Sequence, residues 1–523
     1  MLRAQPTDPT SALPASLRQR LVPYGLASAT ALLIVTPSFY EHCWPLAWIA
    51  LVPLFLALRD TSPRRAFLLG WWTETLTYWV GFYWLIGTMV RFGYIPVPIS
   101  VLLFAIIGIG NGVRLGIFAW WVRRAESVTQ PWWCRLLLPA CSYVALDYLF
   151  PRVFPWYLGV LQLPGVPFIQ VADITGVHGV TWMLVLCSTV VTACLPGTPQ
   201  ALRTARRPML LTCTVLLLLQ GLYGAARLVQ LTTAMQQAPP LRVALIQPNI
   251  GMYEKRSGAD RDAQLDLQLG LSAATLEQHP DLIIWPESMY PFGVPTHFQQ
   301  LPWPVPLDTQ PLHWLIGALS YAGTGSTRQV FNSALLLTSE GKILGRYDKQ
   351  HLLAFGEYIP FQEIFPFLRS ISPAIGNLTP GTGGILTLPG GIGLGPLICY
   401  EDIVPELARR AVQQGAHVLV NLTNDIWFGE TWAPYQHRTL AAFRAVENRV
   451  YLLRVTNTGL TSVIDALGRE QTALPLFQAD ALVHTIRPLR MPSLYTRLGD
   501  WFAWLASGGA LWLSWRYRVT PQR

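Results

Sequence analysis

Long apolar runs fill the first 240 residues of this chain, and they limit its possible folds more than any other feature. Seven runs lie before residue 240 and an eighth lies near the end, at about 24–40, 43–58, 66–89, 95–121, 133–150, 178–196, 208–228 and 499–515. A run of this length with few charges is typical of a membrane-spanning helix, whose backbone satisfies its own hydrogen bonds in lipid. The pattern therefore predicts an α-helical bundle of about eight transmembrane spans.

The composition supports a membrane protein. Of the 523 residues, 51% are hydrophobic and only 13% are charged, and the mean hydropathy is +0.33. The net charge of +9 does not indicate nucleic-acid binding, because the arginines lie in short connections rather than on one basic face. A cleaved signal peptide is the competing interpretation of the first run. It is disfavoured because further apolar runs follow at once and no small-residue cleavage site stands out.

The distribution of arginines predicts the topology. Alternate connections between the apolar runs, together with the end of the chain, carry clusters of arginines, namely Arg59, Arg64, Arg65, Arg123, Arg124, Arg135, Arg203, Arg206, Arg207, Arg516, Arg518 and Arg523. The intervening connections hold only Arg91 and Arg152. Because arginine-rich loops stay in the cytoplasm, those loops and both termini are expected on the cytoplasmic side of the membrane. Residues 241–490 are then expected outside the cytoplasm.

Three charged residues, Glu74, Arg114 and Asp147, lie inside apolar runs. Such residues usually face the interior of a helix bundle and often mark a functional site. We expect these three to pair with one another in a structural role. The long outer connection at 151–177 either lines an entrance at the membrane surface or caps the bundle.

From about residue 241 the pattern changes to short strands that alternate with helices. The predicted strands lie at 241–247, 281–285, 313–317, 332–337, 395–399, 417–421, 451–455 and 461–464, and the predicted helices at 261–278, 403–414 and 436–449. This alternation, with a hairpin-like pair at 332–346, predicts an α/β domain with a largely buried sheet. The chain then divides into a membrane domain (1–240), an outer domain (241–490) and a last transmembrane helix with its tail (491–523).

Cys399 ends a predicted buried strand and precedes the acidic pair Glu401 and Asp402. It is the only one of the seven cysteines in the outer domain, and extracytoplasmic cysteines normally form disulfide pairs. The alternative is a small buried hydrophobe, which is what most free cysteines are. An unpaired thiol outside the cytoplasm is a liability unless it is buried or used, which favours a nucleophile.

Two further residues are candidates to activate this thiol, which attacks only as a thiolate. Glu287 follows a predicted strand directly, where a partly desolvated carboxylate is suited to act as a general base. Its alternative is a carboxylate stabilised at a helix N-terminus. Lys349 is one of only three lysines and could stabilise an oxyanion as a point charge. Its alternative is a solvated surface lysine.

In this chain order, Glu287, Lys349 and Cys399 resemble the Glu–Lys–Cys triad of the nitrilase superfamily, whose members share an αββα sandwich. The resemblance covers about 241–486 and rests on the stretches 247–250, 285–287, 347–349, 355–358, 399–401, 424–429, 444–447 and 456–459. With seven apolar runs before this part and one after it, the whole chain is similar to the apolipoprotein N-acyltransferase family.

The resemblance implies phospholipid-dependent N-acylation of apolipoproteins, the last step of lipoprotein maturation. Glu287 is implied as the base, Lys349 as the oxyanion partner and Cys399 as the nucleophile, which forms a thioester. The expected donor is the phospholipid phosphatidylethanolamine, and the expected acceptor is the N-terminal diacylglyceryl-cysteine of an apolipoprotein. Supporting roles are implied for Glu357, Tyr400 and Glu401, and substrate contacts for Asn424, Trp427 and Phe428. No cofactor and no metal is implied.

The chain departs from the family pattern at two positions. Ala354 stands where a proline is usual, which would loosen a loop, and Arg256 stands where a tryptophan is usual, which would remove one aromatic contact to substrate or lid.

Two other functions stay open. One is a membrane-tethered amidase or nitrilase, which hydrolysis of soluble amides without lipid would favour. The other is a transporter with an outer binding domain, which wild-type function after Cys399→Ser would favour.

Overall fold

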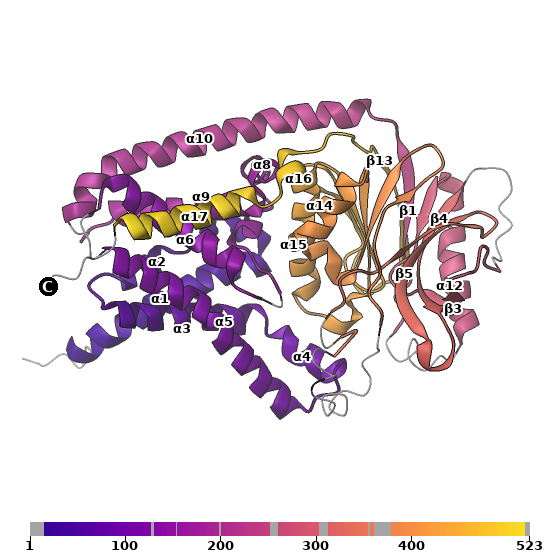
Figure 1. Cartoon of the computed structure of the whole chain (residues 1–523), viewed down its shortest axis with the longest axis horizontal. Coiled ribbons are helices and arrows are strands. Elements are labelled where there is room, and N and C mark those ends of the chain that lie inside the picture. The colour runs from indigo at the N-terminus through magenta and orange to yellow at the C-terminus, as the bar shows by residue number, and fades with distance from the viewer. Residues whose placement is uncertain are drawn as a thin grey trace, which may run out of the picture.

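The structure of the chain is a computed structural model, and it describes residues 15–126, 130–152, 154–197, 200–251, 260–302, 312–353, 356–359, 364 and 378–517. Arg256 and Ala354, the two departures from the family pattern, lie outside the described residues, as does the tail at 518–523. The described chain forms a helical bundle beside an α/β sandwich (Figure 1).

All eight predicted apolar runs are helical. They form α1 (Ala15–Phe39), η1 (Glu41–Ile49) with α2 (Val52–Ala57), α3 (Pro63–Gly81) with α4 (Trp84–Arg91), α5 (Val97–Glu126), α6 (Trp132–Leu149), α9 (Val177–Cys194), α10 (Gln200–Gln237) and α17 (Trp501–Arg516). The run at 66–89 is not one helix, because the chain breaks at Phe82 and Tyr83 between α3 and α4. This break lies beside the candidate site described below.

Four helical segments in the described part of the chain are both long enough and apolar enough to cross a membrane unaided. They are Leu21–Phe39, Val97–Ala125, Val177–Cys194 and Arg203–Gln237. The apolar segment Glu41–Ala57 is shorter. A membrane protein with several apolar helices is thus confirmed, whereas the count of eight spans stays a prediction.

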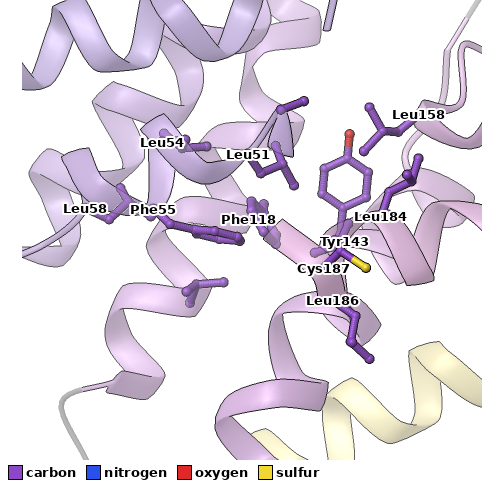
Figure 2. Close-up of a cluster of buried hydrophobic side chains, with 14 of the residues drawn as sticks. Leu51, Leu54, Phe55, Leu58, Phe118, Tyr143, Leu158, Leu184, Leu186 and Cys187 are labelled. Atoms are coloured by element: carbon purple, nitrogen blue, oxygen red, sulfur yellow. The ribbon is translucent and has the colours of Figure 1, made fainter. Parts of the chain in front are cut away.

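Close packing of α3 against α5 depends on glycines. A Cβ at Gly70 would collide with the carbonyl oxygen of Leu115, and a Cβ at Gly112 would lie 2.7 Å from the carbonyl oxygen of Trp71. Small residues at such positions let two helix backbones approach closely. This matters in lipid, where burial of apolar side chains does not by itself favour helix association. The bundle core beside this contact is aliphatic and aromatic (Figure 2), with Phe118 packed edge-on against Tyr143 at a centroid distance of 5.2 Å.

The predicted pairing of the three intramembrane charges is confirmed. The guanidinium of Arg114 contacts Glu74 at 2.8 Å and Asp147 at 3.0 Å. Arg152 contacts Asp147 as well, at 3.1 Å. Two acids and two arginines therefore balance one another within the bundle, which is how buried charges are usually tolerated.

The connection at 151–177 both caps the bundle and contacts the outer domain. It contains η2 (Leu158–Gln162), α7 (Val166–Ile169) and α8 (Ala172–Thr175). The side chain of Gln162 donates to Trp44 O at 2.9 Å, within the bundle. Asp173 forms an ion pair with Arg449 of the outer domain at 2.7 Å.

The outer domain contains two sheets in the described part of the chain. One has the order β13-β1-β2-β4-β5-β6, from strands β13 (Asp480–Ile486), β1 (Leu241–Gln247), β2 (Leu282–Ile284), β4 (His313–Ala322), β5 (Gln329–Thr338) and β6 (Ile343–Asp348), with β3 (Tyr290–Pro295) beside β4. The other has the order β12-β11-β10-β9-β8-β7, from β12 (Glu470–Ala473), β11 (Ser462–Ile464), β10 (Tyr451–Thr456), β9 (Val418–Thr423), β8 (Gly393–Ile398) and β7 (Leu386–Thr387). Every predicted strand is present.

Helices cover both outer faces of the two sheets, so the predicted αββα sandwich is confirmed. Aliphatic side chains of both sheets meet in one core between them. The first sheet is covered by α12 (Arg261–Ala273), and the second by α14 (Pro405–Gln413) and α15 (Ala433–Asn448). Figure 1 shows α14 and α15 between the second sheet and the bundle.

Sequence patterns did not predict strands β3, β7, β12 and β13. β7 has only two residues, β12 has no buried residue, β3 mixes buried and exposed positions without alternation, and β13 has only intermediate burial over most of its length. Without a clean apolar alternation, such a segment gives a weak strand signal. β13 pairs with β1 along its whole length, with Leu241 opposite Ile486.

Candidate active site

The three triad candidates lie at the carboxyl ends of strands and line one cavity of about 360 Å³. Glu287 follows β2, Lys349 follows β6 and Cys399 follows β8. β2 and β6 belong to the first sheet and β8 to the second, so both sheets contribute strand ends to this cavity. Residues more than 100 positions apart are thereby brought together by the fold.

Cys399 adopts a left-handed backbone conformation, with φ of +53°. This costs a residue with a Cβ about 1 kcal/mol, so the surroundings must hold it. The side chain of Asn421 does so by donating to Cys399 O at 3.0 Å and to Leu397 O at 3.1 Å. The sharp turn directs the chain away from β8 directly after the thiol, as expected of a nucleophile presented at a strand end.

The thiol of Cys399 is protonated at rest. Burial raises its pKa above the ordinary value, and the negative charge of Glu287 raises it further, whereas Lys349 lowers it. The thiol proton therefore has to be removed during the attack by a nearby acceptor.

Lys349 is only 1% exposed, so the surface-lysine alternative is wrong. Its Nζ lies 2.8 Å from the carboxylate of Glu357 and 3.7 Å from that of Glu287. Burial lowers the pKa of Lys349, but Cys399, Glu287 and Glu357 outweigh this and raise it above the ordinary value. Lys349 is therefore a fixed cation beside the thiol.

Glu287 lies in a turn and not at a helix N-terminus, so that alternative is wrong too. The turn rests directly on Gly317 of β4, where a Cβ would collide with Pro286 O and lie 2.8 Å from the Cα of Glu287. Asn332 of β5 donates to Glu287 Oε1 at 2.7 Å and to Glu357 Oε1 at 3.2 Å. Sequence patterns did not single out Asn332, although an amide inside an apolar strand was a usable signal.

Glu401 is fully buried behind the cavity and joins the two sheets. Its carboxylate accepts hydrogen bonds from Tyr347 Oη at 2.8 Å and from the backbone N–H groups of Gln350, His351 and Ile398 at 2.7, 3.0 and 2.7 Å. The first three donors belong to the Lys349 segment and the last to the Cys399 strand. Glu401 therefore sets the spacing between the nucleophile and the lysine.

The remaining predicted site residues line the same cavity: Glu357, Tyr400, Asn424, Trp427 and Phe428. Tyr400 stacks on His351, with ring centroids 5.8 Å apart. Asn424 Oδ1 accepts from Asn457 Nδ2 at 3.1 Å, which fixes the amide at the end of β9.

The wall opposite the triad comes from the membrane domain. It contains Phe82, Trp84 and Phe92 from around α4, and Phe154 and Trp156 from the outer connection. Trp84 packs edge-on against Phe428 at 4.9 Å, and its indole N–H donates to Gln436 of α15 at 2.9 Å. The cavity is therefore built by both domains. Sequence patterns did not predict this wall, although the dense aromatic stretch at 78–84 was a signal.

A buried charge cluster lies beside the cavity in the outer domain. His437 Nε2 lies 2.7 Å from Asp402 and its Nδ1 lies 3.1 Å from Asp425. Arg454 contacts both aspartates. Both ring nitrogens of His437 are thus occupied, so His437 is not placed to take the thiol proton. The cluster joins the segment after Cys399 to the segment after β9.

We predict that the stability of the folded protein falls as the pH becomes alkaline, because His437 loses its charge. Burial lowers the pKa of His437, but Asp402 and Asp425 outweigh burial and raise it from 6.5 to about 9. The stabilisation from the imidazolium is then fully present below pH 6.5 and is lost as the pH rises through about 9. His437→Gln should lower the free energy of unfolding by about 3 kcal/mol at neutral pH, because the buried acids then outnumber the buried positive charges that pair with them.

Thermal unfolding of the detergent-solubilised protein between pH 6 and 10 checks this prediction. The melting temperature of the wild type should fall between about pH 6.5 and 9. That of His437→Gln should start lower and fall less over the same range. An equal slope in both proteins would contradict it.

Comparisons with known proteins cover both domains. The profile of the carbon-nitrogen hydrolase family matches residues 242–492, and that of the apolipoprotein N-acyltransferase N-terminal domain matches residues 29–190. The chain is 36% identical to an apolipoprotein N-acyltransferase of Geobacter metallireducens over 479 residues, 89% of each chain. It is 31% identical to one of Azotobacter vinelandii over 507 residues, 94% of each chain. A solved amidase from Nesterenkonia sp. aligns at 20% identity with a TM-score of 0.34, over 49% of this chain and 92% of its own.

Proposed function

This chain belongs to the apolipoprotein N-acyltransferase family and N-acylates lipoproteins, and we propose that it does so through a thioester on Cys399. In this proposal Glu287 is the general base, Lys349 the oxyanion partner and Cys399 the nucleophile. The donor is a phospholipid, specifically phosphatidylethanolamine, and the acceptor is the N-terminal diacylglyceryl-cysteine of an apolipoprotein.

The first half-reaction loads the enzyme. Glu287 takes the proton from Cys399 as the sulfur attacks the ester carbonyl carbon of the phospholipid. The carbonyl oxygen becomes an oxyanion, and Lys349 stabilises it because the buried ammonium is already in place. When the carbon–oxygen bond breaks, Glu287 returns the proton to the departing lysophospholipid, and the acyl chain stays on the sulfur.

The second half-reaction unloads the enzyme. The free α-amine of the diacylglyceryl-cysteine attacks the thioester carbonyl, and Glu287 takes the amine proton. The carbon–sulfur bond breaks, the sulfur regains a proton, and the product carries a new amide. Asn332 orients Glu287, to which it donates a hydrogen bond, and Glu357 orients Lys349, from which it accepts one. Asn332 also donates to Glu357, which links the two pairs.

One observation carries this proposal: the triad groups share one cavity with aromatic side chains that the membrane domain supplies. Removing an acyl chain from the bilayer costs about 0.8 kcal/mol per CH₂ in water, so a lipid substrate needs an apolar path to the thiol. A site for small soluble amides has no need of such a wall. The transporter alternative loses its main support, since Glu74, Arg114 and Asp147 pair with one another.

The proposal includes the topology. Residues 1–240 would cross the inner membrane seven times, 241–490 would lie in the periplasm, and 491–523 would return the chain to the cytoplasm. The arginine bias supports this orientation, as does the position of the cavity between bundle and outer domain.

Mass spectrometry of the purified protein tests the thioester. Phosphatidylethanolamine alone should add one acyl chain at Cys399, and neutral hydroxylamine should release it. A diacylated lipopeptide with a free amine should discharge the enzyme, and an N-blocked lipopeptide should not.

The matched control is Cys213→Ser, which removes a bundle thiol and should leave the adduct unchanged. Absence of any adduct, together with intersecting double-reciprocal plots, would mean direct transfer in a ternary complex.

A further inference from the structure

Three arginines from separate segments line one cavity of about 300 Å³ in the bundle. Arg59 follows α2, Arg123 lies in the last turn of α5, and Arg135 lies in the first turn of α6. We name this space the arginine cavity. Its other described lining residues are mostly apolar or uncharged, and Asp60 is the acidic one among them.

The arginine cavity lies at the end of the bundle remote from the outer domain. Helix α9 begins at Val177, whose N–H donates to Glu447 of the outer domain at 3.1 Å. Thr192, which lines the cavity, lies 15 residues further along the same helix. At 1.5 Å per residue the two positions are about 22 Å apart. The cavity is therefore distinct from the candidate active site.

Backbone carbonyls hold the three guanidinium groups in place. Arg59 donates to Thr192 O at 2.9 Å, Arg123 Nε to Thr61 O at 2.6 Å and Arg135 Nε to Gln130 O at 3.3 Å. These hydrogen bonds orient guanidinium groups from three separate segments of the chain. Asp60 is the one acidic residue among the described lining residues, so arginines outnumber acids there.

The rest of the cavity is apolar and lies between helices. Phe55, which packs beside Phe118 in Figure 2, forms part of the wall together with Val122 and Leu138. Arginines that only set membrane orientation need to lie in loops but need not converge. Basic pockets between transmembrane helices are suited to lipid headgroups, because an anion meets the arginines while acyl chains meet the helices.

We propose that the arginine cavity binds the phosphate group of an anionic phospholipid such as phosphatidylglycerol. The bound lipid is a permanent partner of the bundle and not an acyl donor, since the thiol lies at the other end. The same chemistry would accept inorganic phosphate, and the experiment separates the two sources. The inference does not depend on the mechanism proposed for Cys399.

Native mass spectrometry of the full-length, delipidated protein in detergent is the test, with phosphatidylglycerol, phosphatidylethanolamine and inorganic phosphate as separate probes. The wild type should bind phosphatidylglycerol at least about tenfold more tightly than phosphatidylethanolamine. Arg59→Gln with Arg135→Gln should weaken phosphatidylglycerol binding about thirtyfold, which corresponds to about 2 kcal/mol, or about 1 kcal/mol per arginine.

Arg124→Gln is the matched control, because Arg124 is an exposed arginine on the same helix end that does not line the cavity. It should bind phosphatidylglycerol like the wild type. Equal weakening in this control, or no lipid preference in the wild type together with no phosphate binding, would overturn the proposal. Phosphate binding that the double variant loses, without any lipid preference, would assign the cavity to a free phosphate ion.

A second measurement needs no variant. A phosphatidylglycerol analogue with a photoreactive headgroup should label wild-type peptides that contain residues 59–61 or 189–196. Labelling confined to other parts of the bundle would contradict the site even if the double variant fails to fold.

Discussion

Glu287→Gln should lower the rate of thioester formation by about a thousandfold, within the range known for general bases. Glutamine keeps the shape of the side chain, and its carbonyl oxygen can still accept from Asn332, which now holds Glu287 at 2.7 Å. It cannot take a proton. Because burial and nearby acids raise the pKa of Cys399, the thiol depends on a base for its deprotonation at neutral pH.

The measurement is the initial rate of acyl-adduct formation from phosphatidylethanolamine, followed by mass spectrometry. Glu277→Gln, at an exposed position before β2, is the matched control and should react like the wild type. A normal rate in Glu287→Gln would assign the base elsewhere, with Glu357 as the next candidate because it contacts Lys349 and Asn332.

Lys349→Arg should lose activity by at least about a hundredfold although it keeps the charge. The ammonium of Lys349 fits between Glu287 and Glu357 in a fully buried position. A guanidinium is larger and planar, so it would displace these carboxylates and move its charge away from the oxyanion. Loss of one oxyanion donor typically costs a factor of 10² to 10³.

The chain offers a matched control for this substitution. Lys342 is an exposed lysine in the same β5–β6 hairpin, and Lys342→Arg should be silent. Adduct formation and discharge onto lipopeptide are measured separately, and both should fall in Lys349→Arg because each passes through an oxyanion. Retention of most activity would mean that Lys349 balances charge without taking part in the reaction.

The outer-domain fold could be predicted, and the three triad candidates could be singled out, because their signals are local. Lys349 and Cys399 directly follow strands, and Glu287 lies three residues after the end of β2. A short apolar run is readable without tertiary information. A shared site was suggested by the order of these residues together with the stretches of sequence that resemble the family. Their burial and mutual distances were not readable, since these depend on how the two sheets meet.

The parts that escaped prediction depend on contacts between distant segments. The apolar run at 66–89 gives no sign that the helix breaks at Phe82, because aromatic residues also occur within continuous membrane helices. The break is stabilised from the outer domain, where Gln436 accepts from Trp84 and donates to Gly81 O at 3.0 Å. The pairing of His437 with two buried aspartates could not be predicted either, because these partners lie 35 and 12 positions away in the sequence.

The pairing of β1 with β13 bears on how such a chain is assembled from modules. Leu241 lies opposite Ile486, so the sandwich begins and ends at one point, between α10 and the segment that leads to α17. A unit with adjoining ends can be inserted into a helical protein without forcing its flanking helices apart. Here both flanking helices pack against α6. A complete hydrolase-like unit could therefore be acquired in one insertion, and the residues that would then have to evolve together are those where the two domains touch, such as Trp84 with Gln436 and Asp173 with Arg449.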